Sequence, residues 1–101
     1  MNQAQHLFKQ TQQACQMMGF HLSDLSNVFD LDNDAIDPNS QQGELARTLI
    51  HICQLLQALM GYAAMKSFMF CENKNTKGMP IEQIKMPGGI EAIHAYLDAI
   101  P

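Results

Sequence analysis

At 101 residues, the chain is long enough for one domain with a modest hydrophobic core. Hydrophobic residues make up 47% of the chain and charged residues 16%, a composition that is typical of a globular protein and argues against a disordered one. The net charge of −4 argues against a general affinity for nucleic acids or for anionic membranes.

The N-terminal segment and the cysteines predict a cytoplasmic protein. The first ten residues, MNQAQHLFKQ, have neither the basic start nor the apolar stretch of a signal peptide. The charge-free segment 48–65 carries polar side chains that a lipid-facing span would avoid, so it predicts a buried helix and no membrane span. The odd number of cysteines, with no CxxC pair, predicts that Cys15, Cys53 and Cys71 are buried, reduced thiols.

In the first part of the chain, the spacing of apolar residues predicts two helices and a turn. A helix over residues 2–18 places its apolar residues on one face and ends at Gly19. Ser23 is a good N-cap for a second helix. The segment 30–37, which is rich in aspartate and is followed by Pro38, predicts a turn with at most one short helical turn.

The strongest helical pattern in the chain covers residues 41–60. Its apolar face includes Leu45 and Leu59, and Ile50 and Leu55 widen that face further. An apolar arc of this width predicts that the helix lies at the centre of the core or is shared with a second copy. We therefore expect a homodimer or a higher oligomer, with Leu45, Ile50 and Leu55 at the interface.

The second part of the chain predicts three further helices. Gly61 ends the long helix, and residues 62–72 form the next one. A polar loop leads to Pro80, which suits the first turn of a short helix. After Pro87 and two glycines, a final helix carries a core stripe that extends to Ile100.

No segment alternates with the period of two residues that a half-buried strand shows, so the predicted fold class is all-α. We expect a single domain, residues 1–101, built as a small bundle of about five to six helices. Within it, residues 1–38 form an N-terminal helical segment, and residues 39–101 form a second segment that contains the strongest helix.

The histidines offer no catalytic or metal-binding pattern. The residues one turn before and after His51 are Arg47 and Leu55, which excludes a helical zinc motif there. Glu91 and His94 are neighbours on a helix, a spacing that is more typical of a solvated pair than of a site. No nucleophile or phosphate-binding motif is present either, so we predict that the protein is not an enzyme and uses no cofactor or metal.

The acidic turn has a partial likeness to a calcium-binding loop. Asp30, Asp32 and Asp34 match the first three ligand positions of an EF-hand. Ala35 then stands where the sharp turn needs glycine, and Gln41 stands where a bidentate glutamate is needed. We interpret this segment as an acidic, helix-capping turn.

The N-terminal pattern of helix, turn and helix is also compatible with a DNA-binding helix-turn-helix. However, no Lys or Arg occurs between Lys9 and Arg47, whereas six acidic residues do. A recognition helix needs cations to neutralise phosphates. We therefore interpret residues 1–38 as an eroded helix-turn-helix segment, and we expect that DNA binding is unlikely.

A motif in the second half carries a resemblance to a known family. It reads Phe68-Met69-x-x-x-Asn73, then Gly78-x-Pro80-Ile81-x-x-Ile84, then Gly89-Ile90-x-x-Ile93-x-x-Tyr96-Leu97. In order and spacing, it resembles the toxin-binding domain of the Xre/MbcA/ParS antitoxin family, and the likeness covers residues 42–101. The family usually has Trp and Leu where this chain has Phe68 and Met69, and an apolar residue and Gly where it has Thr76 and Lys77.

The resemblance implies an antitoxin of a toxin–antitoxin system. Its partner would be a RES-type toxin, which consumes NAD, and the antitoxin would cover the active site of the toxin. Two alternatives stay open: a helix-turn-helix transcription regulator, and an orphan relative with no toxin.

We expect the partner to dock on the polar loop and on the outward side of the final helix. The exposed cations of the loop, the outward aromatic side chain of the final helix and the position of toxin contacts in the family all favour this end of the chain. The predicted partner-binding residues are Asn73, Lys74, Lys77, Gly78, Glu91, His94, Tyr96 and Asp98.

Overall fold

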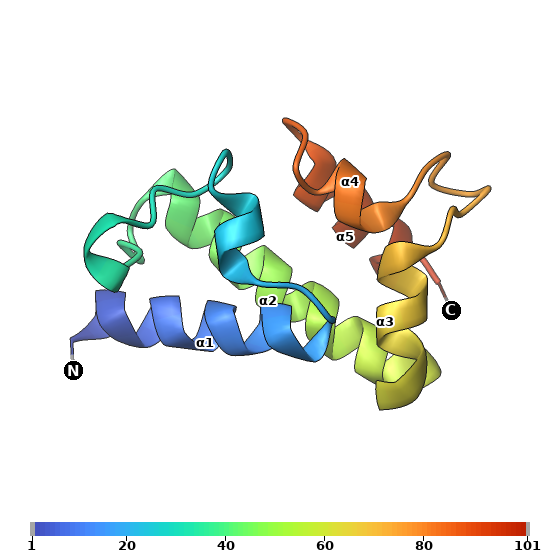
Figure 1. Ribbon diagram of the computed structural model, residues 1–101, viewed down its shortest axis with the longest axis horizontal. Helices are drawn as coiled ribbons and strands as arrows, with labels where there is room; N and C mark the ends of the chain where they lie inside the picture. Colours follow the sequence, from blue (N-terminus) through green and yellow to red (C-terminus); the bar gives the residue numbers. More distant parts are fainter. Residues whose placement is uncertain (1, 101) are drawn as a thin grey trace.

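A computed structural model describes residues 2–100, and within this range the chain forms helices and no strand (Figure 1). The all-α fold class is confirmed. Two 3-10 turns, η1 (Leu22–Leu25) and η2 (Asp32–Asp34), lie between the first two helices. The five α-helices are α1 (Gln3–Met17), α2 (Gln41–Met60), α3 (Tyr62–Phe70), α4 (Pro80–Gln83) and α5 (Gly89–Asp98).

Helix α2 is the centre of the core. It packs against α1, α3 and α5, and its residues Leu49, Ile52 and Leu56 are completely buried. Figure 1 shows α1 along one side of α2, while α3, α4 and α5 gather at the other end of the molecule. This arrangement explains why α2 needs apolar side chains on most of its circumference.

The start of α2 and its end are both set locally. The Ser40 hydroxyl accepts a hydrogen bond from the Gly43 backbone N–H at 3.0 Å, which is the expected N-cap geometry. At the other end, Gly61 has φ +79°, a value that favours glycine. The chain turns there, and α3 leaves at 116° to α2. No single helix within residues 2–100 is long and apolar enough to cross a membrane.

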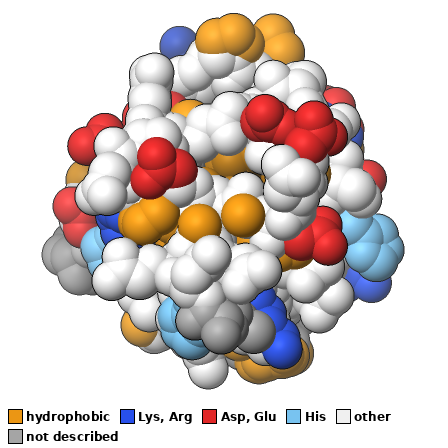
Figure 2. All heavy atoms as spheres, turned by 90° about the vertical axis from the view of Figure 1, so that its left-hand side faces the viewer, with side chains coloured by type: hydrophobic (Ala, Val, Ile, Leu, Met, Phe, Trp, Pro, Cys, Tyr) orange, Lys and Arg blue, Asp and Glu red, His pale blue; other side chains and the backbone are white. Residues whose placement is uncertain are grey.

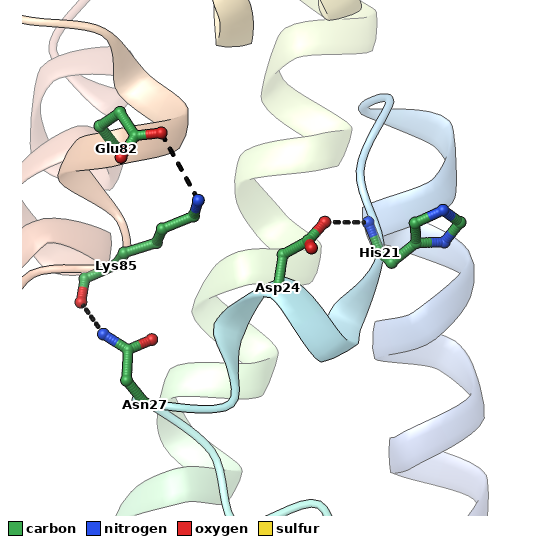
Figure 3. Close-up of polar contacts among 5 residues, drawn as sticks. All are labelled: His21, Asp24, Asn27, Glu82 and Lys85. Carbon is green, nitrogen blue, oxygen red and sulfur yellow. Dashed lines mark hydrogen bonds and ion pairs between the residues drawn. The ribbon is translucent and has the colours of Figure 1, made fainter.

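The predicted α-helix beginning at Ser23 is wrong. Only the 3-10 turn η1 forms, and the Asp24 carboxylate accepts a hydrogen bond from the backbone N–H of His21 at 3.0 Å (Figure 3). The segment is nevertheless anchored, because Leu25 and Phe29 are buried in the core. Without that helix, the N-terminal segment lacks the second helix that a helix-turn-helix requires.

The segment after η1 is tied to both ends of the molecule. The Asn27 side-chain amide donates a hydrogen bond to the Lys85 carbonyl, just after α4, at 2.6 Å (Figure 3). Further on, the Ile36 backbone N–H donates to the Ala4 carbonyl at the start of α1 at 3.0 Å. These contacts hold an irregular stretch in place through long-range bonds that local propensity does not reveal.

Three side chains that were expected to be buried are exposed. Leu59 (38% exposed) lies on the last turn of α2, where α3 has already turned away. Ile100 (38% exposed) follows the end of α5, so it does not continue the core stripe. Cys71 is exposed because it lies just after α3, where the backbone is extended.

The three predicted oligomer-interface residues are half-buried within the chain itself. Leu45, Ile50 and Leu55 all pack against the core. The apolar arc of α2 is therefore largely covered by the protein's own helices, and an oligomer through this helix stays a prediction.

Candidate partner-binding site

The polar loop before α4 is a tight, internally bonded turn. Asn73 and Gly78 form a β-bridge, in which the Asn73 N–H donates to the Gly78 carbonyl at 2.9 Å. The Asn73 side-chain oxygen also accepts hydrogen bonds from the backbone N–H groups of Asn75, at 2.8 Å, and Thr76, at 3.4 Å. Asn73 is thus the residue that shapes the loop, as expected of an Asx turn.

Two side-chain contacts join this loop to the helices behind it. The Gln83 amide, at the end of α4, donates a hydrogen bond to the Thr76 carbonyl. The Asn75 amide donates to the Tyr96 hydroxyl, on α5, at 3.2 Å. The other amide atom of Gln83, its oxygen, is buried and accepts no hydrogen bond within the described residues. The loop is held against both helices.

The corner between α4 and α5 is packed backbone against backbone. A Cβ atom placed on Gly89 would overlap the carbonyl oxygen of Gln83 and lie 2.6 Å from its carbonyl carbon. Glycine is therefore required at this position for a steric reason. Its neighbour Gly88 has open space around it, and glycine is favoured there only by the left-handed backbone (φ +77°).

The loop, this corner and α5 enclose a groove of about 380 Å³. Met86, which lines it, is 63% exposed, the highest value among the exposed large hydrophobic side chains of residues 2–100. A groove with apolar walls and amide groups at its edge suits the insertion of a partner's side chain. Its principal lining residues are Asn75, Thr76, Gln83, Met86, Ala92 and Tyr96.

The predicted partner-binding residues fall on two separate surfaces. Tyr96 lines the groove and is half-buried, so the expectation that it points outward is only partly met. His94 lies on the other side of α5, where its Nε2 atom is 2.7 Å from Nδ1 of His51 on α2. By helical spacing, Glu91 and Asp98 share the side of His94 and are exposed. The groove and the His94 side are therefore distinct.

The four predicted loop residues have different roles. Lys74 and Lys77 are exposed beside the groove, and Lys77 has a left-handed backbone (φ +63°). Asn73 and Gly78 make the bridge that closes the loop, so they support the surface rather than present it.

Sequence reasoning missed Asn75, Gln83 and Met86 as groove residues. Asn75 lies between two predicted site residues, Lys74 and Lys77, and this position is a usable signal. An apolar Met86 in a short link between helices was a second usable signal. No sequence pattern marks Gln83, because its contact with Thr76 depends on how α4 folds back against the loop.

The buried thiols are unsuited to nucleophilic chemistry. Burial raises the pKa of Cys15 to about 12, with smaller contributions from Cys53 and Asp24. Burial likewise raises the pKa of Cys53. Since the thiolate is the reactive form, both groups are inert near neutral pH.

Within the described residues, no group of three or more His, Cys, Asp or Glu side chains is arranged to hold a metal ion. No protein-family model matches the chain, and no curated protein is similar to it in sequence.

Proposed function

We propose that the chain is an antitoxin-like protein-binding module that docks through the groove beside Tyr96 and neutralises a RES-type, NAD-consuming toxin. The observation that carries the proposal is the groove itself. It is built from the segment of the motif that resembles the toxin-binding domain, and it combines a pre-formed hollow with the exposed Met86 and an aromatic anchor.

The motif residues have roles that suit a binding module. Asn73 and Gly78 hold the loop closed, Pro80 begins α4, and Gly89 lets α5 approach α4 closely. A loop fixed in this way loses little conformational entropy on binding, so more of the contact energy contributes to affinity.

The charge around the groove favours an acidic partner surface. Three of the six Lys and Arg residues of the chain, Lys74, Lys77 and Lys85, lie within twelve residues of sequence, with Glu82 as the one acid among them. Lys85 pairs with Glu82 at 3.5 Å, so the two loop lysines are the cations most available to a partner. Complementary charge speeds association more than it raises affinity.

The alternative of a DNA-binding regulator has less support. The residues between Lys9 and Arg47 contain no cation, and Asp30, Asp32 and Asp37 line a hollow at the start of α1 and α2. Figure 2 shows acidic side chains around hydrophobic ones on this face of the molecule. Phosphates would be repelled there.

The test is capture of a partner with the full chain from the source organism, followed by an assay of the purified partner. Addition of the chain should inhibit NAD consumption by that partner. Tyr96→Ala and Met86→Ala should each weaken binding by about 1–2 kcal/mol, or roughly 5- to 30-fold in Kd. Charge reversal of Lys74 and Lys77 should mainly slow association.

The matched control is Tyr62→Ala, because Tyr62 is 60% exposed but lies at the start of α3, outside the groove. This variant should bind as the parent does. A captured partner that consumes no NAD would refute the antitoxin role. Equal affinity of the Tyr62, Met86 and Tyr96 variants would refute the groove as the docking site.

A further inference from the structure

Two histidines from different helices meet on the surface opposite the groove. Nδ1 of His51, on α2, lies 2.7 Å from Nε2 of His94, on α5, and the ring centroids are 4.9 Å apart. At this distance one ring donates its N–H to the other. A single proton therefore occupies the space between two nitrogen atoms that are both capable of binding a metal.

The geometry is close to that of a two-histidine metal site. Zinc–nitrogen bonds of about 2.0–2.1 Å at a tetrahedral angle place two ligand nitrogens about 3.3 Å apart. The present separation needs to open by only roughly 0.6 Å for a metal to replace the proton. His51 is exposed and His94 is half-buried, so small rotations of the two rings can provide this.

The surroundings of the pair are polar and open. The rings border a shallow hollow whose other walls are Glu44, Arg47 and Thr48. The Arg47 guanidinium borders this hollow and donates a hydrogen bond to the Pro38 carbonyl, before the start of α2, at 2.8 Å. The exposed Glu44 carboxylate lies on the same side of α2 as His51, two turns earlier, and contributes negative charge.

We propose that His51 and His94 form a binding site for a divalent transition metal of the zinc type. The two imidazoles supply two ligands and water completes the coordination, since no third protein ligand is grouped with them within residues 2–100. The metal would link α2 directly to α5. It would thus fix the helix that carries Tyr96, without occupying the groove.

Zinc titration by calorimetry at about pH 8 tests the proposal, because histidine binds a metal in its neutral form. The full-length Cys71→Ser variant serves as the parent, because an exposed thiol would also bind zinc. A single zinc should bind, and His51→Ala or His94→Gln should weaken binding at least about tenfold. His6→Ala and His21→Ala are the matched controls, and both should bind as the parent does.

His94→Gln also separates metal binding from a purely structural role. Glutamine can keep a hydrogen bond to His51 but is a poor zinc ligand, so the variant should fold as the parent does and lose the metal. With the parent, zinc at about 100 times its Kd should raise the Tm by roughly 10 °C or more. Unchanged zinc affinity in both pair variants, or an equal loss in the His6 and His21 variants, would overturn the proposal.

Discussion

Gly89→Ala should destabilise the protein, although a glycine-to-alanine change in a helix ordinarily stabilises it. Gly89 is the first residue of α5 and has no left-handed backbone, so alanine suits its conformation. The expected gain from conformational entropy is about 0.5–1 kcal/mol. The obstacle is steric, because the added Cβ would overlap the carbonyl group of Gln83.

The size of the effect follows from how far the corner must open. The new Cβ would lie 2.6 Å from the Gln83 carbonyl carbon, whereas ordinary contacts begin at 3.4 Å. A backbone carbonyl has no flexible end that could give way, so α5 must shift by at least about 0.8 Å to clear the carbon, and further to clear the oxygen. That shift disturbs Ile90 and Ile93, which are buried. Overpacking costs typically about 1–3 kcal/mol, and the constrained backbone favours the upper end, so the net loss should be about 2 kcal/mol.

Thermal unfolding followed by circular dichroism measures this loss. A net destabilisation of about 2 kcal/mol should lower the Tm by roughly 10 °C in a domain of this size. Gly88→Asn is the matched control: asparagine tolerates the left-handed backbone of Gly88, and the space around that residue is open. Its Tm should stay within a few degrees of the parent. A Gly89→Ala variant as stable as the parent would refute the close packing of α4 against α5.

Two further predictions concern the thiols and the contact of the N-terminal segment with α4. Ellman's reagent should modify Cys71 rapidly in the native protein and Cys15 only on unfolding. Because the pKa of Cys15 is raised to about 12 in the folded state, the unfolded chain releases this proton first, and stability should fall as the pH rises from about 9 toward 12. Asn27→Ala removes the hydrogen bond to the Lys85 carbonyl and should cost about 0.5–1.5 kcal/mol in urea unfolding. The exposed neighbour Ser26 serves as its control, and an equal loss in Ser26→Ala would contradict a specific role for Asn27.

The long helices could be predicted because each carries its own periodic pattern and end signals. The bounds of α2 agree with the predicted 41–60, since Ser40 caps one end and Gly61 breaks the other. The start of α4 at Pro80 likewise follows from the fixed backbone of proline. Such features depend only on residues that are close together in the sequence, so they can be predicted without knowledge of the tertiary structure.

The irregular segment and the side-chain pairings could not be predicted in the same way. A 3-10 turn at Leu22–Leu25 replaces the predicted α-helix, and the segment after it is held by a long-range bond, from the Asn27 side chain to the Lys85 carbonyl. The meeting of His51 with His94 depends on how α5 crosses α2, 43 residues later in the chain. Periodicity indicates which face of a helix is apolar, but it does not identify the residue opposite a polar one.

One side of helix α5 belongs to the proposed docking groove, and the other side belongs to the proposed metal site. Tyr96 faces the groove, while His94 meets His51 on the far side. Both sides are fixed to the same buried stripe, of which Ile93 and Leu97 are part. A contact that immobilises α5 at His94 therefore also limits the positions that Tyr96 can take. If a metal at the histidine pair reduces the motion of α5, the affinity of the groove for its partner should rise. Linkage between two sites is reciprocal, so the partner should raise the affinity for the metal by the same factor.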